Sequence, residues 1–493
     1  MNAPSPVISE PETPRRRLPS MPKISFRPSP DVVKIVLLWA AWLAIICAFQ
    51  IAVEARVQPA RPDNTLAWTP SETGKGFPAA TGSGCRPMLA DPNMNQHVAF
   101  DSEYYISIAT TGYDDPNAPA YVDMNGHVLN AGVPSCNDNM DGWTSLDYAF
   151  MPAYPMTMRP VMAVESVLPF TSDLTNYGRA TLAGIIVSAV GGLLAMLALA
   201  RLMAYLERRR KPTAKDDENA VAKVGPWGGT HGLRTALYLL VFPTGFYLAQ
   251  VYTEGLFIGL AFMACALAVE KKVVGATIFA CVAVLTRQAG VFLFLPIAWA
   301  ALQILRDGET RPRNWRIAVP IVATLAPLAT FAVWFFSSLG QNWQTVEKEY
   351  FTRSFDIPKS IDLWQKSWDA LVTGIDKTGA NTGYGIYGGG LLPSSTSFYI
   401  ALEFIALALA VVSCIWLLRR MPGVALFGLA VIVLSAGSSS AQGMDRYVLA
   451  VPAIFLMLAW FGRREVFDRA WVIGSTLMMG LLVMLFTFGF WVS

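Results

Sequence analysis

Long apolar stretches alternate with short polar segments along most of the chain. A membrane-spanning helix needs about 20 mostly apolar residues, and we predict eleven of them. The short polar segments 252–254 and 286–288 are expected to form tight hairpins between neighbouring helices. The predicted spans are residues 32–53, 180–205, 233–250, 253–270, 272–288, 289–305, 316–338, 398–418, 422–440, 445–462 and 470–491.

Two polar segments are long enough to do chemistry outside the membrane, namely residues 54–179 and 339–397. The pattern divides the chain into a disordered N-terminal arm (1–31), a first membrane module (32–305, with loop 54–179) and a second (306–493, with loop 339–397). The predicted fold is an all-α polytopic membrane protein with amphipathic helices in the first large loop.

Composition supports a membrane protein, because 54% of the residues are apolar and only 15% are charged. Soluble domains carry about 25% charged residues. The formal net charge of +3 is too small to suggest nucleic-acid binding, and three widely spaced histidines make a histidine metal site an unattractive prediction.

Lys and Arg residues gather in the short loops of one side of the predicted topology, and such loops usually face the cytoplasm. This bias predicts a cytoplasmic N-terminus and, with an odd number of spans, an extracytoplasmic C-terminus. A basic N-terminus, few cysteines and no retrieval signal favour a bacterial plasma membrane.

Cys85 and Cys136 are the cysteines of the water-exposed segments, and both fall in the first large loop. A pair in an oxidising compartment is a reasonable disulfide. Two unpaired thiols are the alternative.

The run 100–113 (FDSEYYISIATTGY) places Tyr105, Ile108 and Ala109 on one helical face, which predicts an amphipathic helix lying on the membrane. Asp101 stands at its start. Residue types alone leave two interpretations open: Asp101 is an ordinary N-cap and Glu103 a first-turn acid, or the pair is functional.

The segment 148–155 carries Pro152 and Pro155 among aromatic residues. Proline removes a backbone donor and fixes φ. We therefore expect a stiff apolar turn here rather than a regular helix.

Ionisable residues at membrane depth are candidates for function, although each could instead be an interfacial anchor. On the predicted topology Asp101, Glu103, Glu254, Arg287 and Arg446 all lie at the outer face. Arginine binds phosphate oxygens bidentately, and a carboxylate can act as a base or bind sugar hydroxyls. Their convergence favours a lipid-phosphate substrate.

The second large loop has apolar residues at helical spacing (Ile361, Trp364, Trp368, Leu371 and Ile375), which predicts a helix on the membrane surface. The glycine-rich run 383–390 is not a dinucleotide fingerprint, because no strand precedes it. It is either a flap over a lipid or acceptor groove or a plain loop.

Four ordered blocks resemble the motifs of PIG-V-type mannosyltransferases, the GPI mannosyltransferase 2 type, which belong to the multi-spanning GT-C glycosyltransferases. Residues 100–113 resemble W-D-x-x-x-[FY]-x-x-I-A-x-x-G-Y, and 149–155 resemble A-F-F-P-x-[FY]-P. Residues 243–257 are similar to P-x-x-x-[FY]-x-x-x-x-Y-[ST]-E-x-L-F, and 286–290 to T-R-x-x-G. Phe100 replaces the usual Trp, 114–146 look like an insertion, and the chain after 300 matches only generally.

The resemblance implies a GT-C fold whose first module is catalytic. It implies that a mannosyl residue passes from polyprenyl-phosphate mannose to a lipid-linked or glycolipid acceptor on the extracytoplasmic face, with inversion. Asp101 would be the base, and Glu103 a weaker catalytic candidate. Arg287 and Arg446 would stabilise the leaving phosphate, and Glu254 would bind the donor sugar or orient an arginine.

Tyr252 and Tyr447, next to these residues, are expected in the donor site. A role for a divalent cation is open: an Asp-x-Glu sequence can hold one, but enzymes of this type are generally thought to work without metal. The acceptor is also open, between a phosphatidylinositol mannoside, a lipoglycan and a protein.

A lipid or sugar transporter, or flippase, is the main alternative. It predicts charges near the bilayer midplane, whereas the predicted spans carry charges almost only at their ends. A non-catalytic subunit of an enzyme complex would keep the fold and tolerate loss of Arg287 or Arg446. Within the enzyme class, the donor could instead be a polyprenyl-phosphate arabinofuranose, galactose or glucose.

Overall fold

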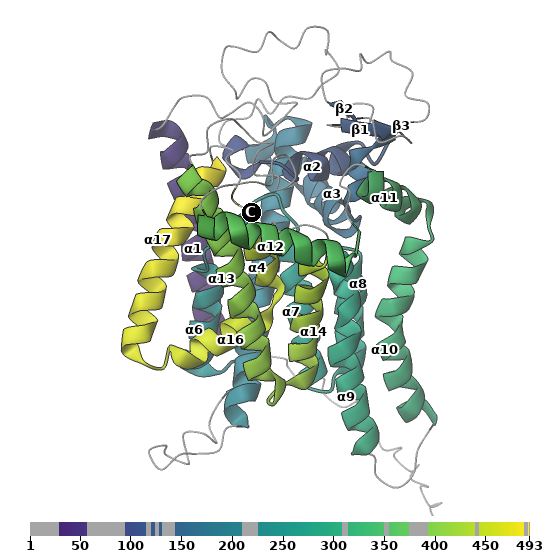
Figure 1. Cartoon of the computed structure of the whole chain (residues 1–493), viewed down its shortest axis with the longest axis vertical. Helices are drawn as coiled ribbons and strands as arrows, with labels where there is room; N and C mark the ends of the chain where they lie inside the picture. Colours follow the sequence, from purple (N-terminus) through teal and green to yellow (C-terminus); the bar gives the residue numbers. More distant parts are fainter. Residues whose placement is uncertain are drawn as a thin grey trace, which may run out of the picture.

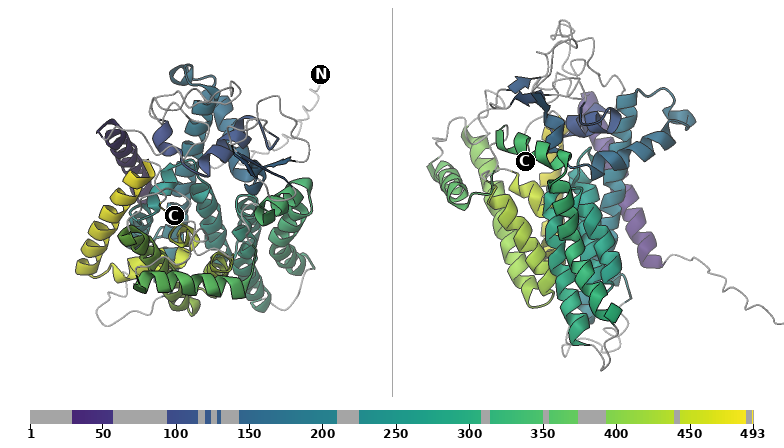
Figure 2. Two further views of the ribbon diagram at one scale, coloured as in Figure 1. Left: turned by 45° about the horizontal axis from the view of Figure 1, so that its top comes forward. Right: turned by 90° about the vertical axis from the view of Figure 1, so that its right-hand side faces the viewer.

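The computed structural model describes residues 29–56, 94–114, 120–123, 128–130, 143–209, 225–307, 314–349, 354–373, 393–438, 443–487 and 492. These residues are mostly helical, and the long helices lie side by side in a bundle (Figures 1 and 2). The α-helices are α1 Pro30–Arg56, α2 Ser102–Thr110, α3 Ala153–Glu165, α4 Asn176–Arg208, α6 Gly229–Leu240, α7 Glu254–Val269, α8 Val273–Val284, α9 Phe294–Arg306, α10 Asn314–Phe335, α11 Ser338–Glu349, α12 Ile357–Thr373, α13 Pro393–Leu418, α14 Pro422–Ala436, α15 Met444–Tyr447, α16 Pro452–Phe461 and α17 Glu465–Thr487.

Short 3₁₀ helices and three short strands complete the described part of the chain. The 3₁₀ helices are η1 Asn95–His97, η2 Leu146–Ala149, η3 Pro169–Thr171, η4 Gly245–Ala249, η5 Gln288–Leu293 and η7 Val448–Ala450. The strands are β1 Ala120–Asp123, β2 Val128–Asn130 and β3 Trp143–Ser145, paired antiparallel in the order β2-β1-β3. This small sheet lies within the predicted insertion, and the all-α prediction did not include it.

Six helical segments in the described residues are long and apolar enough to cross a membrane, so the chain is a multi-pass membrane protein. They are α1, α4, η5 with α9, α10, α13 and α17. A seventh is added if the bent pair Met444–Ala450 and Pro452–Phe461 counts as one span. The predicted helical, many-span class is confirmed, and the number eleven stays a prediction.

The other predicted spans correspond to shorter or interrupted helices. The apolar helices α7, α8 and α14 have 16, 12 and 15 residues, and at 1.5 Å per residue each is shorter than the roughly 30 Å apolar core of a bilayer. The predicted span 233–250 is not one helix: α6 ends at Leu240, and η4 begins at Gly245. Pro243 lies in the break, where it cannot donate to a continuing helix.

The described parts of the first large loop lie at one end of the bundle, which we call the α2 end. Figure 1 shows α2, α3 and the strands gathered there, with α12 lying across the bundle nearby. The prediction that α2 lies on the membrane surface is wrong. Tyr105 and Ile108 are buried as expected, but Glu103, Ile106 and Ser107 on its other faces are buried too, because the helix packs between protein elements, chiefly α3 and α4.

The segment around Pro152 and Pro155 is also more regular than predicted. It opens α3, with Pro152 at the N-cap and Pro155 in the first turn. Proline is tolerated there because the first-turn N–H groups have no partner within the helix. The expectation of a turn without a helix is therefore wrong.

Glycine allows α4 and α7 to pack with their backbones almost touching. A Cβ on Gly191 would lie 2.4 Å from the carbonyl of Gly255, and one on Gly259 would lie 2.4 Å from the carbonyl oxygen of Gly191. Small residues permit this close approach in membrane helices. The contact fixes the start of α7, where Glu254 lies.

Candidate functional site

Asp101 stands immediately before α2, but its side chain does not cap that helix. Ser102 instead bonds back to Ala99: its hydroxyl donates to the Ala99 carbonyl over 2.9 Å. The Tyr252 hydroxyl donates to the same carbonyl over 2.8 Å. The Asp101 carboxylate is therefore turned away from capping, and this geometry argues against the ordinary N-cap interpretation.

The Asp101 carboxylate binds Arg446 instead. Nη1 of Arg446 lies 3.2 Å from Oδ2 of Asp101, and Nε lies 3.3 Å from Oε1 of Glu254. The arginine thus joins two carboxylates that are 153 positions apart in the chain.

Glu254, the first residue of α7, is the centre of the cluster. Its Oε1 also accepts a hydrogen bond from Nη2 of Arg287 at 2.5 Å, and Nε of Arg287 donates to the Thr253 hydroxyl over 2.9 Å. Oε2 of Glu254 is buried and has no hydrogen-bond partner among the described residues. Two arginines therefore converge on one oxygen of one carboxylate.

Aromatic rings enclose the two guanidinium groups. The Arg446 Cζ lies 5.7, 5.3 and 5.4 Å from the ring centres of Tyr247, Tyr252 and Tyr447, and Arg287 lies 5.6 Å from that of Tyr447. Rings at this distance attract a cation through their faces. They also limit the directions in which each arginine can move.

The four charges alternate in sign along the cluster and differ in exposure. The side chains of Asp101 and Arg287, at its two ends, are 30% and 17% exposed, whereas Arg446 and Glu254 between them are 8% and 1% exposed. The inner pair is thus held by the protein, and the outer two are accessible to a substrate.

The structure brings together six of the predicted site residues: Asp101, Tyr252, Glu254, Arg287, Arg446 and Tyr447. Glu103 is buried on α2, one residue beyond Ser102. The predicted pair Cys85 and Cys136 lies outside the described residues, and the disulfide stays a prediction.

Sequence reasoning did not single out Tyr247, Thr253 or Glu403. Tyr247 and Thr253 lie inside the motif block 243–257. The motif therefore pointed to the segment that holds them, but not to their individual contacts. Glu403 had its own signal, because it is the one Asp, Glu, Lys or Arg in the apolar span Phe398–Leu418.

The donor set around Asp101 does not fit a metal ion. No group of three or more His, Cys, Asp or Glu side chains among the described residues could hold one. Asp101 already binds a guanidinium group, and Arg446 would repel a cation there.

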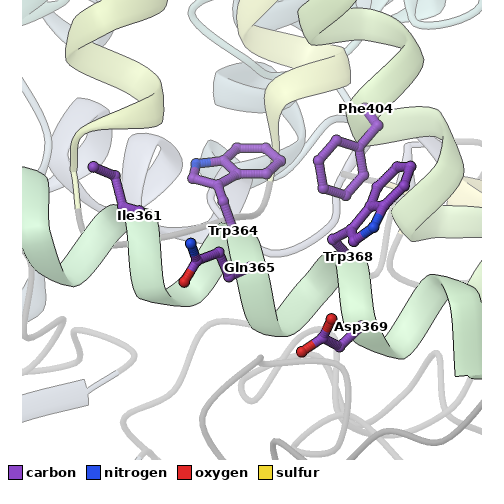
Figure 3. Close-up of a pocket in the computed structure, with 6 residues that line it drawn as sticks. All are labelled: Ile361, Trp364, Gln365, Trp368, Asp369 and Phe404. Atoms are coloured by element: carbon purple, nitrogen blue, oxygen red, sulfur yellow. The ribbon is translucent and has the colours of Figure 1, made fainter.

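A hollow of about 340 Å³ lies along α12, and none of the residues that line it belongs to the charged cluster (Figure 3). In Figure 3, Trp364 and Trp368 point to the side of α12 where Phe404 of α13 lies. The ring centre of Phe404 is 5.2 Å from that of Trp364 and 5.4 Å from that of Trp368. The predicted helix is confirmed over Ile357–Thr373, and its place on a membrane surface stays a prediction. Ile375 and the glycine-rich run 383–390 lie outside the described residues.

No protein-family model and no curated protein matches this chain. The PIG-V resemblance therefore stays a prediction.

Solved structures of the Archaeoglobus fulgidus oligosaccharyltransferase are similar to the chain. The match to the apo form has a TM-score of 0.38 and 12% sequence identity. It covers 92% of this chain and 56% of the oligosaccharyltransferase chain. The match to the complex with zinc and sulfate has a TM-score of 0.36 and 15% sequence identity. It covers 91% of this chain and 53% of the oligosaccharyltransferase chain. The match to the form tethered to an acceptor peptide has a TM-score of 0.37 and 14% sequence identity. It covers 92% of this chain and 55% of the oligosaccharyltransferase chain. The chain spans little more than half the length of these chains.

Proposed function

We propose that the chain is a membrane glycosyltransferase of GT-C type that moves a mannosyl residue from polyprenyl-phosphate mannose to a lipid-linked or glycolipid acceptor. The observation that carries the proposal is the Asp101–Arg446–Glu254–Arg287 cluster. Its members come from four distant segments and meet at one end of an apolar bundle. A lipid phosphate sugar would present a head group to such a cluster while its chain stays among lipids.

Asp101 is the proposed base. It takes the proton of the acceptor hydroxyl as that oxygen attacks the anomeric carbon of the donor sugar. The bond between that carbon and the phosphate oxygen breaks, and its electron pair leaves with the polyprenyl phosphate. Because attack and departure occur on opposite faces, configuration inverts and a β-linked donor gives an α-mannoside.

The two arginines are the proposed partners of the departing phosphate. A guanidinium group presents parallel N–H donors that match two phosphate oxygens, and fixed positive charge stabilises the negative charge that develops on the leaving group. Arg287 is the more exposed of the two. The contacts of Glu254 favour a role in orienting both arginines over direct binding of the donor sugar.

The α2 end is the proposed extracytoplasmic face of a plasma membrane. The distribution of Lys and Arg in the short loops supports this orientation. The proposed topology keeps eleven crossings, several of them short or interrupted. Interrupted backbone is tolerated at membrane depth where protein surrounds it, and the residues of η4 are all buried.

The test uses purified protein in detergent with labelled polyprenyl-phosphate mannose and a membrane-lipid extract as acceptor. Wild type is compared with Asp101→Asn and with Asp114→Asn. Asp114 is an acid of the same loop that accepts a hydrogen bond from the Tyr148 hydroxyl at 2.7 Å and is not in the cluster.

We expect transfer by wild type and Asp114→Asn, and a loss of roughly 10²–10⁴-fold in Asp101→Asn, which is the usual contribution of a general base. Equal transfer by Asp101→Asn would remove it from the chemistry. Arabinofuranose, galactose and glucose donors run in parallel identify the sugar. Movement of the intact donor across proteoliposomes without transfer would identify a flippase instead.

A further inference from the structure

Arg446 lies on a stretch of backbone that has little regular structure to hold it. Its helix, α15, is only four residues long. The chain then bends by 84° between Met444–Ala450 and Pro452–Phe461. The residue before α15, Gly443, has a φ of +75°, which only glycine adopts at little cost. The position of Arg446 must therefore come from contacts outside its own helix.

Glu403 of α13 supplies three of these contacts. Its Oε1 accepts a hydrogen bond from the Gly443 amide at 2.8 Å. Its Oε2 accepts bonds from the Met444 amide at 2.6 Å and from the Asp445 amide at 3.2 Å. One carboxylate thus binds the three amides that directly precede Arg446.

A second contact holds the same turn from another element. The Thr244 hydroxyl donates to the Asp445 carbonyl over 2.9 Å. Thr244 stands directly before η4, the 3₁₀ helix that carries Tyr247, whose ring faces Arg446. The turn is therefore fixed between α13 and η4.

A carboxylate in an apolar helix is expensive unless its hydrogen bonds are satisfied. Glu403 is buried and is the one Asp, Glu, Lys or Arg of the span Phe398–Leu418. An apolar residue would serve the packing of α13 without this cost. The presence of a carboxylate is explained by the three amide donors that it binds.

We propose that Glu403 is a positioning residue, which holds the 443–445 backbone so that the Arg446 side chain meets Asp101 and Glu254. The consequence for catalysis rests on the function proposed above. The hold on the backbone does not, because it follows from the three hydrogen bonds themselves. Two carboxylate oxygens can accept all three backbone N–H groups. A glutamine side chain has only one acceptor oxygen, and its NH₂ group would point its own N–H donors at backbone N–H donors.

The matched control is Glu207→Gln. Glu207 is a buried carboxylate on α4 that pairs with Arg463 near the opposite end of the bundle. Both substitutions replace one buried carboxyl group of a membrane helix by an amide, but only Glu403→Gln changes the support of Arg446. A general loss of stability would affect both variants alike.

The first measurement is hydrogen exchange of the peptide that contains residues 443–446, in purified protein without substrate. We expect Glu403→Gln to raise its exchange rate by about tenfold or more, since losing hydrogen bonds worth about 1.4 kcal/mol changes an opening equilibrium tenfold. Glu207→Gln should leave this peptide unchanged. Unchanged exchange in Glu403→Gln would overturn the proposal.

The second measurement is the Kd for a short-chain polyprenyl phosphate, together with the transfer rate. Glu403→Gln is expected to lower transfer by roughly 10- to 100-fold, and Glu403→Asp, which keeps both oxygens, to recover part of it. If Glu403 acts through Arg446, the double variant Glu403→Gln with Arg446→Ala binds no more weakly than Arg446→Ala alone.

Additive losses of binding in the double variant would overturn the positioning role. Wild-type protein that neither binds polyprenyl phosphate nor transfers a sugar would refute the proposed function instead. The exchange of residues 443–446 would then decide alone whether Glu403 holds the turn. If Glu403→Gln does not fold, Glu403→Asp gives the exchange result, with a smaller increase expected.

Discussion

Ion pairs occur at both ends of the bundle, and the two ends differ in how these pairs are built. At the end where α16 meets α17, Arg463 pairs with Glu207, and Arg234 pairs with Asp468 over 3.0 Å. The first pair joins the turn between α16 and α17 to α4, and the second joins α6 to α17. At the α2 end, Arg446 and Arg287 instead converge on Glu254, and Asp101 extends the cluster towards solvent.

This difference separates a structural charge from a candidate functional one. Each ion pair at the α16–α17 end joins one arginine to one carboxylate. In the α2-end cluster, Glu254 has a buried oxygen without a hydrogen-bond partner among the described residues, and the accessible charges lie at the ends. Burial alone therefore does not mark the site. The cluster proposed as the site differs from the other pairs by the convergence of distant segments on one carboxylate.

The largest contrast is expected from removing the central arginine of each end. Arg446→Ala leaves Asp101 and Glu254 without their shared cation, so transfer should fall by roughly 10²–10³-fold. Arg463→Ala leaves Glu207 buried and unpaired, which costs about 3–5 kcal/mol of stability, but transfer per folded molecule should stay within about threefold. Initial transfer rates and thermal unfolding in detergent measure both effects.

The control for this comparison is the folded fraction, measured by size-exclusion chromatography before each assay. Comparable losses of transfer per folded molecule in Arg446→Ala and Arg463→Ala would show that the two ends do not differ in function. The distinction drawn from convergence would then be wrong.

A second contrast compares the carboxylates. Glu254→Gln removes the negative charge on which both arginines converge, and we expect transfer to fall by about 100-fold, since misplaced groups near the chemistry cost about that much. Glu207→Gln should change transfer by less than about threefold. The kcat and KM for the donor, measured on both variants, check this. A larger effect in Glu207→Gln would contradict it.

A third, smaller contrast tests the guanidinium geometry. Arg287→Lys keeps the charge but loses the planar fork that binds two oxygens, so the donor KM should rise by about tenfold. Arg201→Lys, on α4, replaces an arginine that binds Glu270 and does not belong to the cluster, so the donor KM should not change. An unaltered KM in Arg287→Lys would remove this residue from donor binding.

The sequence predicted which charged residues lie together better than it predicted the local structure around them. Asp101, Glu254, Arg287 and Arg446 were expected to lie at one face, and the structure brings them into contact. Charged residues at the ends of apolar helices are visible in a sequence because so few charges occur near them. Their shared membrane side then limits where they can meet.

Features that depend on tertiary packing were not predictable in the same way. The amphipathic pattern of α2 cannot distinguish a lipid surface from a protein surface, since both bury apolar residues. The first turn of α3 accepts Pro155 only because of where the helix begins. The role of Glu403 depends on a turn 40 residues later in the chain, and no spacing rule joins the two.

The smallest contrast concerns pH and the segment that leads into Asp101. Burial lowers the pKa of His97 from 6.5 to about 4, although hydrogen bonds with the Ala249 carbonyl and the Gln250 side chain act in the opposite direction. Between these values the unfolded chain binds a proton that the folded chain does not, so the stability from His97 is complete above pH 6.5 and is lost as the pH falls towards 4. The loss is at most about 1.4 kcal/mol per pH unit.

Melting temperatures of wild type and His97→Asn should therefore converge as the pH is lowered from 7.5 to 4.5, because asparagine does not titrate and other groups contribute equally to both proteins. A difference that stays constant with pH would show that His97 titrates normally in the folded protein.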